Sequence, residues 1–271
     1  MYFLKATGFE YDSHYLSDFG FVICSFDGSS GVQNVNVGSE ISFNTVPIRQ
    51  GKHHSLTSAV YEGTYETEFD IMKNYCDTDE TEISDEEFRR MMRWLNRREF
   101  LPLRFIDEDG DIDSIFFNAS FNIEKIISDD IIYGLHLTMK TNKPFGYGEL
   151  YKASWESTAN VVYPVNDISD EIGDTFPTLV ITPKSSGDLY IINDTIKRET
   201  VIKNCTSGET ITLDNEHQMI FTDRKTHKLY NDFNFVFFKL VNTFDNRTND
   251  IKTNIPCDIE LSYYPIVKDG I

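Results

Sequence analysis

The sequence predicts an α+β fold that is mostly β and has two domains. Short segments with the composition of β-strands recur along the whole chain. One amphipathic helix, which begins at Ser84, interrupts them in the first half. The pattern fades over residues 146–162, where glycine, serine and threonine are frequent. We therefore expect an N-terminal domain over residues 1–145, a connector over residues 146–162 and a C-terminal β-sandwich over residues 163–271.

The length and composition of the chain allow two hydrophobic cores. Of its 271 residues, 40% are hydrophobic and 14% are aromatic. A chain of this size and composition folds as one large or two ordinary domains. We expect the first domain to be a belt-like β-sandwich that carries the helix and one β-hairpin.

Four strands are expected before the helix. The small residues at Asp27–Gly31 and the polar residues around Gln50–Ser55 separate strand-like segments from one another. Such short strands favour a meander or a sandwich. The four expected strands are Phe3–Phe9, Gly20–Phe26, Glu40–Val46 and Ala59–Phe69.

The helix has a start signal, an apolar face and a stop signal. Ser84 and Glu87 have the spacing of a capping box, and Pro102 prevents continuation of the helix. The apolar residues recur at helical spacing and are Phe88, Met91, Met92 and Leu95. We expect this face to be buried against the sheet of the first domain, while Trp94 beside it fits either a core or an interface.

A β-hairpin and a closing strand follow the helix. Leu101–Ile106 and Ile112–Asn122 have the pattern of paired strands around a turn at Asp107–Gly110. Ile131–Thr141 alternates between apolar and polar residues and is expected to complete the first domain.

The second domain is expected to be purely β, with no helical pattern among its strands. Turn residues at Ser185–Asp188 and Ser207–Glu209 separate short apolar segments, which is typical of a sandwich or jelly roll. The expected strands are Thr178–Pro183, Asp188–Ile192, Thr200–Asn204, Glu209–Asp214, Gln218–Thr222, Phe233–Leu240 and Cys257–Tyr264.

Charge and cysteine content exclude several classes of protein. A net charge of −19 argues against sequence-specific nucleic-acid binding, which is built from Lys and Arg. We find no secretion signal and no apolar run long enough to span a membrane. The cysteines lack metal-ligand spacing, so we expect reduced structural thiols and synthesis in a cytoplasm. They are Cys24, Cys76, Cys205 and Cys257.

No set of residues in the sequence matches a known catalytic or metal-binding motif. Asp107–Asp113 begins like a calcium loop, but Ile112 and Asn118 occupy the positions of the essential glycine and glutamate, so a hairpin turn is preferred. His53 and His54 are adjacent, so on a strand their rings would point apart and could not share a metal, and a solvated loop is expected there. The serines of Asp27–Gly31 fit a glycine turn without any nucleophile motif. We therefore expect no enzyme and assign no catalytic, cofactor-binding or metal-binding residues and no cofactors.

The order of elements resembles a known family. The segments that carry the resemblance are GFEYDSHYLSDFG at Gly8–Gly20, RWLNRREFLPLRFIDEDG at Arg93–Gly110, FFNASF at Phe116–Phe121, LHLTMKTNKPFGY at Leu135–Tyr147 and IPCDIELSYYP at Ile255–Pro265. Together they resemble the distal tail protein family of long-tailed, non-contractile, siphovirus-like bacteriophages. The last segment resembles the galectin-like C-terminal β-sandwich of that family.

The resemblance implies a structural virion protein. Members of that family assemble into a ring of six at the distal end of the tail tube, with a central channel for DNA. The implied partners are further copies of the chain, the tail tube protein and the tail-tip or baseplate receptor-binding proteins. The implied location is the tail tip of the virion, after synthesis in the host cytoplasm. An acidic chain suits a channel through which DNA slides without adhering.

The alternative is a lectin-like module that binds the host cell wall. Stacking on sugars requires exposed aromatic faces, for which the sequence offers tyrosines but no tryptophan within residues 163–271. Trp94 falls in the helix and Trp155 in the connector. The candidate tyrosines are Tyr147, Tyr151, Tyr190, Tyr230, Tyr263 and Tyr264. We expect the second domain to bind other proteins rather than sugars.

Overall fold

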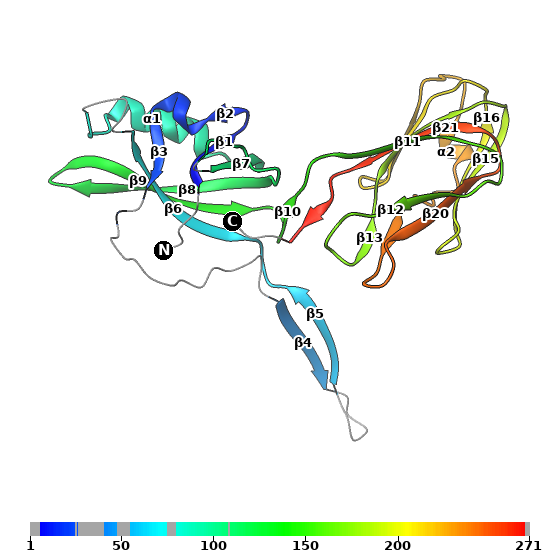
Figure 1. Cartoon of the computed structure of the whole chain (residues 1–271), viewed down its shortest axis with the longest axis horizontal. Helices are drawn as coiled ribbons and strands as arrows, with labels where there is room; N and C mark the ends of the chain where they lie inside the picture. Colours follow the sequence, from blue (N-terminus) through cyan, green and yellow to red (C-terminus); the bar gives the residue numbers. More distant parts are fainter. Residues whose placement is uncertain are drawn as a thin grey trace. The chain divides into compact units, whose positions relative to one another are not determined.

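The computed structural model describes residues 6–24, 26, 41–47, 55–74, 80–107 and 109–268. The chain divides into two units (Figure 1). The first comprises Met1–Gly148 and Val267–Ile271, and the second comprises Glu149–Ile266. Both are built mainly from β-strands, which confirms the predicted fold class.

The first unit is organised around one antiparallel sheet of seven strands. β1 and β3 lie near opposite ends of the strand order yet contact each other, so the sheet curls around its own core. The expected second layer of a sandwich is therefore supplied by the curl of one sheet and by a helix. In spatial order the strands are β2 (His14–Tyr15), β1 (Ala6–Tyr11), β7 (Leu101–Asp107), β8 (Phe117–Ser128), β9 (Ile131–Thr141), β6 (Glu66–Lys73) and β3 (Phe21–Cys24), with a 3₁₀ turn, η1 (Leu16–Phe19), after β2.

The helix α1 (Asp85–Leu95) begins as the sequence predicts. The Glu87 N–H donates to the Ser84 hydroxyl at 3.3 Å, and the Ser84 N–H donates to the Glu87 carboxylate at 2.8 Å. The second carboxylate oxygen of Glu87 pairs with the ammonium of Lys73 on β6 at 2.9 Å. Lys73 is buried, so this pair attaches the start of the helix to the sheet.

The apolar face of α1 packs into the core, as predicted. Met91 and Leu95 are buried, whereas Phe88 and Met92 are half-buried. Trp94 belongs to the core and donates its indole N–H to the Tyr11 carbonyl oxygen at 3.1 Å.

An aromatic cluster fills the space inside the curled sheet. The ring of Phe9 lies 5.9 Å from that of Phe69, 6.5 Å from that of Phe105 and 5.8 Å from that of Phe121. These rings come from four different strands, and the Trp94 ring stacks on Phe9 at 5.6 Å. Burial of such large side chains is the main source of stability for this unit.

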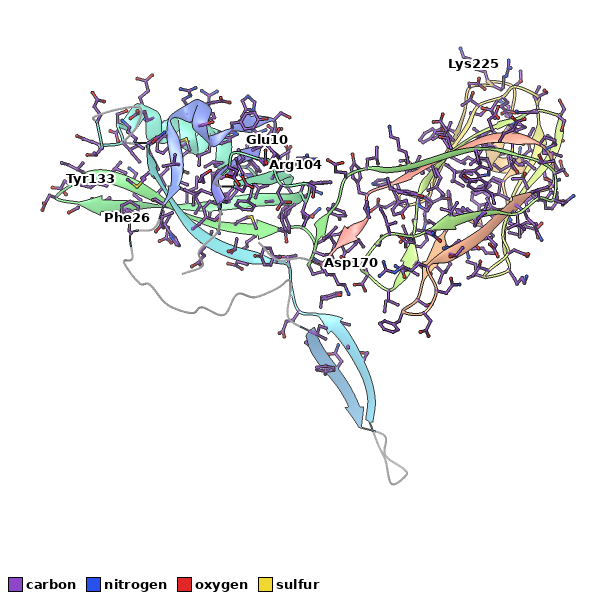
Figure 2. The ribbon with its side chains drawn as sticks, viewed as in Figure 1. Glu10, Phe26, Arg104, Tyr133, Asp170 and Lys225 are labelled. Carbon is purple, nitrogen blue, oxygen red and sulfur yellow. The ribbon has the colours of Figure 1, made fainter. Side chains whose placement is uncertain are left out.

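One glycine permits a close approach on β9. A Cβ at Gly134 would lie 2.6 Å from the ring of Phe26 and 3.0 Å from the Ile71 carbonyl oxygen. The Phe26 side chain, labelled in Figure 2, therefore packs against β9 only because position 134 lacks a side chain.

A second, separate sheet of the first unit is a two-stranded hairpin. It pairs β4 (Ile41–Pro47) with β5 (Ser55–Tyr61), and among the described residues no ladder joins it to the seven-stranded sheet (Figure 1). The prediction of one strand over Ala59–Phe69 is wrong, because the chain turns at Glu62–Tyr65. Gly63 has φ of 83°, a left-handed conformation that ends β5 before β6 begins.

The hairpin after the helix differs in its second strand. β7 forms as predicted, but β8 begins at Phe117 and continues to Ser128 rather than spanning Ile112–Asn122. Asp107 and Asp113 accept hydrogen bonds from nearby backbone N–H groups, and within residues 109–115 the pairing is reduced to an isolated bridge between Ile112 and Ile106. β9 spans Ile131–Thr141 as predicted.

The second unit is a sandwich of two antiparallel sheets around a single core. The five-stranded sheet has the order β11 (Tyr151–Ser157), β21 (Cys257–Tyr263), β14 (Thr178–Pro183), β17 (Ile211–Asp214) and β18 (Met219–Thr222). The four-stranded sheet has the order β12 (Tyr163–Asn166), β20 (Thr248–Thr253), β15 (Gly187–Asn193) and β16 (Arg198–Cys205). A further pair in this unit joins β13 (Gly173–Thr175) with β19 (Leu240–Asn242). In the first unit, β10 (Gly146–Tyr147) pairs with β22 (Ile266–Val267), whose last residue belongs to that unit.

Two expectations for this half of the chain are wrong. The segment 146–162 is not merely a connector, because it contains β11, an edge strand of the five-stranded sheet. Its polar and small residues, such as Ser154 and Ala153, make the alternation of apolar and polar residues too weak to recognise in the sequence. Phe233–Leu240 is also irregular rather than a strand, and a one-turn helix, α2 (Leu229–Asp232), precedes it. Phe235 in this segment has φ of 56°, which is incompatible with a regular strand.

Candidate interaction surfaces

The acidic turn after β7 is held by its own carboxylates. Asp107 Oδ1 accepts the N–H groups of Asp109 and Asp111, each at 2.9 Å, and Asp113 Oδ1 accepts that of Ile115 at 2.9 Å. The hairpin-turn interpretation of Asp107–Asp113 therefore agrees with the geometry. Within the described part of the chain, no group of three or more His, Cys, Asp or Glu side chains is placed to hold a metal ion.

The described thiols are free and poorly suited to nucleophilic chemistry. Cys24, Cys205 and Cys257 form no disulfide. Burial raises the pKa of Cys24 and of Cys205 to about 12, and it also raises the pKa of Cys257. These thiols stay protonated near neutral pH, whereas a nucleophilic cysteine needs a lowered pKa. Cys76, the His53–His54 pair and the Asp27–Gly31 segment lie outside the described residues.

The tyrosines considered for sugar binding do not share a sheet. Tyr263 on β21 is buried, and its hydroxyl donates to Asp167 Oδ1 at 2.9 Å. Burial raises the pKa of Tyr263 well above its usual range. Tyr190 lies half-buried on β15 of the other sheet, and Tyr230 is exposed on α2. Tyr190, Tyr230 and Tyr263 therefore do not present their rings on a common sheet face.

The remaining aromatic candidates pair with neighbours. The Tyr147 ring lies 5.3 Å from that of Phe116, and the Tyr151 ring lies 5.2 Å from that of Tyr263. Tyr264, at the end of β21, is 50% exposed. None of these contacts builds a row of parallel exposed rings among the described residues.

The second unit does contain a tryptophan, because Trp155 lies on β11. Its ring stacks on that of Tyr163 with 4.5 Å between centroids and 1° between planes. Trp155 is 9% exposed, whereas Tyr163 is 38% exposed and covers it. The expectation of a sandwich without tryptophan is wrong. The outward-facing ring of the stack is nevertheless a tyrosine.

A buried contact between a histidine and a carboxylate lies beside the loop after β18. The Nδ1 of His227 lies 2.6 Å from Glu209 Oε1, and the Nε2 lies 2.9 Å from the Lys203 carbonyl oxygen. The Thr222 hydroxyl and the Thr206 N–H also donate to the Glu209 carboxylate. The groups that contact the Glu209 carboxylate belong to Thr206, Thr222 and His227, and all of them form hydrogen bonds within the fold. The contact therefore holds the loop after β18 in place and does not form a reactive site. Sequence patterns gave no sign of it, because its members are distant along the chain.

Exposed apolar side chains mark the hairpin of the first unit. Ile41 and Phe43 on β4 are 55% and 69% exposed, and Val60 on β5 is 45% exposed. A two-stranded hairpin has little stability in water without a further surface to pack on. Exposed apolar residues on such an element are typical of a surface that is covered on assembly. No helix among the described residues is long and apolar enough to cross a membrane.

The curled-sheet unit followed by a β-sandwich is the fold of a phage distal tail protein. It is similar to the crystal structure of the SPP1 Dit (gp 19.1) protein, described there as a paradigm of the hub adsorption apparatus in phages that infect Gram-positive hosts. The TM-score is 0.63 at 15% sequence identity, and the match covers 95% of this chain and 98% of that one.

Sequence relationships place the chain in a family. Residues 4–143 match the family described as "Phage tail protein N-terminal domain", and residues 145–263 match that described as "Phage tail C-terminal domain". The chain belongs to this family of phage tail proteins. It is also 27% identical over 191 residues to the SPbeta prophage-derived uncharacterized protein YomH of Bacillus subtilis (strain 168), a match covering 68% of this chain and 71% of that protein. The resemblance stated from the sequence is confirmed.

Proposed function

We propose that this phage tail protein forms a hexameric ring at the distal end of the tail tube. The ring links the tube to the tail-tip or baseplate proteins and leaves a central channel for DNA. The first unit forms the ring, and the second unit carries contacts to other tail proteins. The fold shared with SPP1 Dit over 95% of the chain is the observation that carries this proposal.

The separate hairpin of the first unit supports assembly of copies. Ile41, Phe43 and Val60 expose apolar surface on a hairpin that, in the described part of the chain, has no ladder to the seven-stranded sheet. In a cyclic ring, each interface joins two different patches, so a projecting element on one copy needs a receiving surface on the next. Burying these side chains against a neighbour would remove the cost of their exposure.

The net charge suits the passage of DNA. With a formal charge of −19, the chain repels phosphate groups instead of binding them. We propose that the protein is no enzyme, since its role is positional and the described side chains form no catalytic set. It is made in the host cytoplasm and is then incorporated into the tail.

Electron microscopy of purified tails tests this proposal. We expect a reconstruction to show six copies around the tail axis at the distal end of the tube. A substitution that places a charge on the hairpin, Phe43→Asp, is expected to prevent ring closure, because it buries an unpaired carboxylate at the interface. The matched control is Phe244→Asp in the second unit, where the side chain is 88% exposed. A single copy off the tail axis would contradict the proposal.

The alternative, a lectin-like module, is favoured by one observation. Tyr163 presents its ring on top of Trp155, and Val161 and Val162 beside it are 55% and 43% exposed. A flat aromatic face of this kind suits stacking on a sugar. Saturable binding to purified host cell walls that is lost in Tyr163→Ala would support this alternative. Tyr230→Ala, which removes an exposed ring elsewhere, is the control.

A further inference from the structure

The exposed side of α1 carries three arginines that have no acidic partner in the fold. They are Arg89, Arg90 and Arg93, and we call them the basic face. No carboxylate or other acceptor among the described residues lies within bonding distance of their guanidinium groups. Arg89 and Arg93 are four residues apart, a spacing at which like charges repel on a helix. Such a set indicates a partner outside the fold.

Arg90 is already held in a geometry that suits a carboxylate. Its guanidinium carbon lies 4.6 Å from the centre of the Phe19 ring. The Phe19 ring stacks in turn on that of Trp94, with 4.3 Å between centroids. A guanidinium that rests on an aromatic ring keeps the N–H groups at its edge free, and their planar fork matches a carboxylate. The chemistry of this face therefore fits an acidic surface.

The seven-stranded sheet offers such a surface. Glu66 and Glu68 on β6 and Glu124 on β8 are exposed, and we call them the acidic face. Strand β9 lies between them, where Glu68 is paired with Thr138 and Glu124 with His136. Thr138 and His136 are two residues apart on their strand, so all of these side chains share one face of the sheet.

Two of the three glutamates have no lysine or arginine partner. Lys140 pairs with Glu66 at 3.0 Å. His136 lies 3.7 Å from Glu68, and no described cation pairs with Glu124. The acidic face can therefore accept arginines from another molecule.

The basic and acidic faces lie on opposite sides of the first unit. Lys125, the neighbour of Glu124 on β8, places its ammonium 4.0 Å from the centre of the Phe88 ring on α1. Consecutive side chains of a strand point to opposite faces, so Glu124 points away from the helix. Figure 1 shows α1 on one side of β8 and β9.

We propose that the basic face of one copy docks on the acidic face of the next copy in the ring. This inference rests on the proposed ring and names one of its contacts. Each interface of a closed ring joins two different patches of the same chain, and these two patches differ in position and in sign of charge. Chains with a net charge of −19 repel one another, so a ring of them needs local attraction of this kind.

The two faces are similar in size. Arg89 and Arg93 are about 6 Å apart along the helix axis. Glu68 and Glu124 lie on strands separated by one other strand, which places them about 10 Å apart. The long side chains of arginine and glutamate cover this difference. Charge pairs of this kind set the orientation of two copies, while the apolar hairpin adds buried surface.

Neutral variants of each face test the contact. The arginine variant replaces the basic face with Arg89→Gln, Arg90→Gln and Arg93→Gln. The glutamate variant replaces the acidic face with Glu66→Gln, Glu68→Gln and Glu124→Gln. In sedimentation of the full-length chain up to about 1 mM, we expect the wild type to associate and each variant to need about tenfold higher concentration.

Net charge does not account for these expected effects. The glutamate variant has less overall repulsion between copies than the wild type, so weaker association in it reflects a lost contact. The control for the arginine variant removes the same charge from three exposed lysines of the second unit, with Lys203→Gln, Lys225→Gln and Lys228→Gln. This control should associate as the wild type does.

Mixing the two variants gives the sharpest test. The arginine variant keeps its acidic face, and the glutamate variant keeps its basic face. At a concentration where each alone is a single copy, the mixture should form pairs that contain one copy of each. Association should stop at two copies, because the remaining faces of the pair are both neutral. Pairing also shows that both variants are folded.

Three results would overturn the contact. They are a wild type that stays a single copy throughout the series, a neutral variant of either face that associates as the wild type does, and a mixture that does not pair. A ring in the tail reconstruction together with a mixture that does not pair refutes this contact alone. Pairing of the variants without a ring in the tail refutes the proposed function alone.

Discussion

At the scale of single residues, the ionisation of the buried Glu209 carboxylate contributes to the stability of the second unit. Burial opposes its charge, but the hydrogen bonds from Thr222, Thr206 and His227 outweigh burial and lower the pKa of Glu209 below its ordinary value of 4.5. A carboxyl with a lowered folded pKa stabilises the fold above its unfolded pKa. That stabilisation is lost as the pH falls through the folded pKa.

The variant Glu209→Gln should show this dependence directly. We expect the free energy of unfolding at pH 7 to fall by about 1–3 kcal/mol, because buried donors lose a charged acceptor. Between pH 7 and pH 3, the variant should lose less stability than the wild type. Chemical denaturation at several pH values measures both effects. Glu260→Gln, at an exposed position of β21, is the control, and an equal effect in both variants would contradict the role of Glu209.

At the scale of elements, α1 is fixed to its sheet by contacts at both ends. The Glu87–Lys73 pair holds its start, and the Asn96 side-chain amide donates to the Phe121 carbonyl oxygen at 3.0 Å after its last turn. Between them, Met91 and Leu95 enter the core. The apolar face of the helix is thus part of the core.

The variant Leu95→Ala measures what this packing contributes. Leu95 is fully buried, and its truncation should lower the free energy of unfolding by roughly 2–5 kcal/mol through lost transfer energy and a residual cavity. Chemical denaturation provides the value. Arg89→Ala, on the exposed face of the same helix, should change it by less than about 0.5 kcal/mol. An effect near zero for Leu95→Ala would mean that the helix is not packed in solution.

At the scale of the whole molecule, two separate cores predict two unfolding steps. The core clusters of the two units share no residue. In calorimetry we expect Leu95→Ala to lower only one transition temperature. Ile191→Ala, in the second core, should lower only the other. One transition that shifts equally in both variants would show that the units unfold together.

Strands in which apolar and polar residues alternate regularly could be predicted from the sequence. Ile131–Thr141 and Thr178–Pro183 form strands with the predicted limits, since one face of each is strongly apolar. β11 and β20 were missed because their buried positions include Ser157, Asn249 and Thr253, which bond to polar partners inside the sandwich. A polar residue can be recognised as a buried position of a strand only when its hydrogen-bond partner is known.

The sequence by itself determined the mostly β composition, the position of α1 and the relationship to phage tail proteins, because these depend on local periodicity and on the order of segments. Only the tertiary structure decided that Trp94 and Tyr263 are buried and that Trp155 lies on an edge strand of the second unit. Burial and edge position depend on which distant strands pair. Nine of the described strands of the second unit form two sheets in which the order of strands differs from their order along the chain. Long-range pairing of this kind is fixed by the whole packed core and leaves little trace in any single segment.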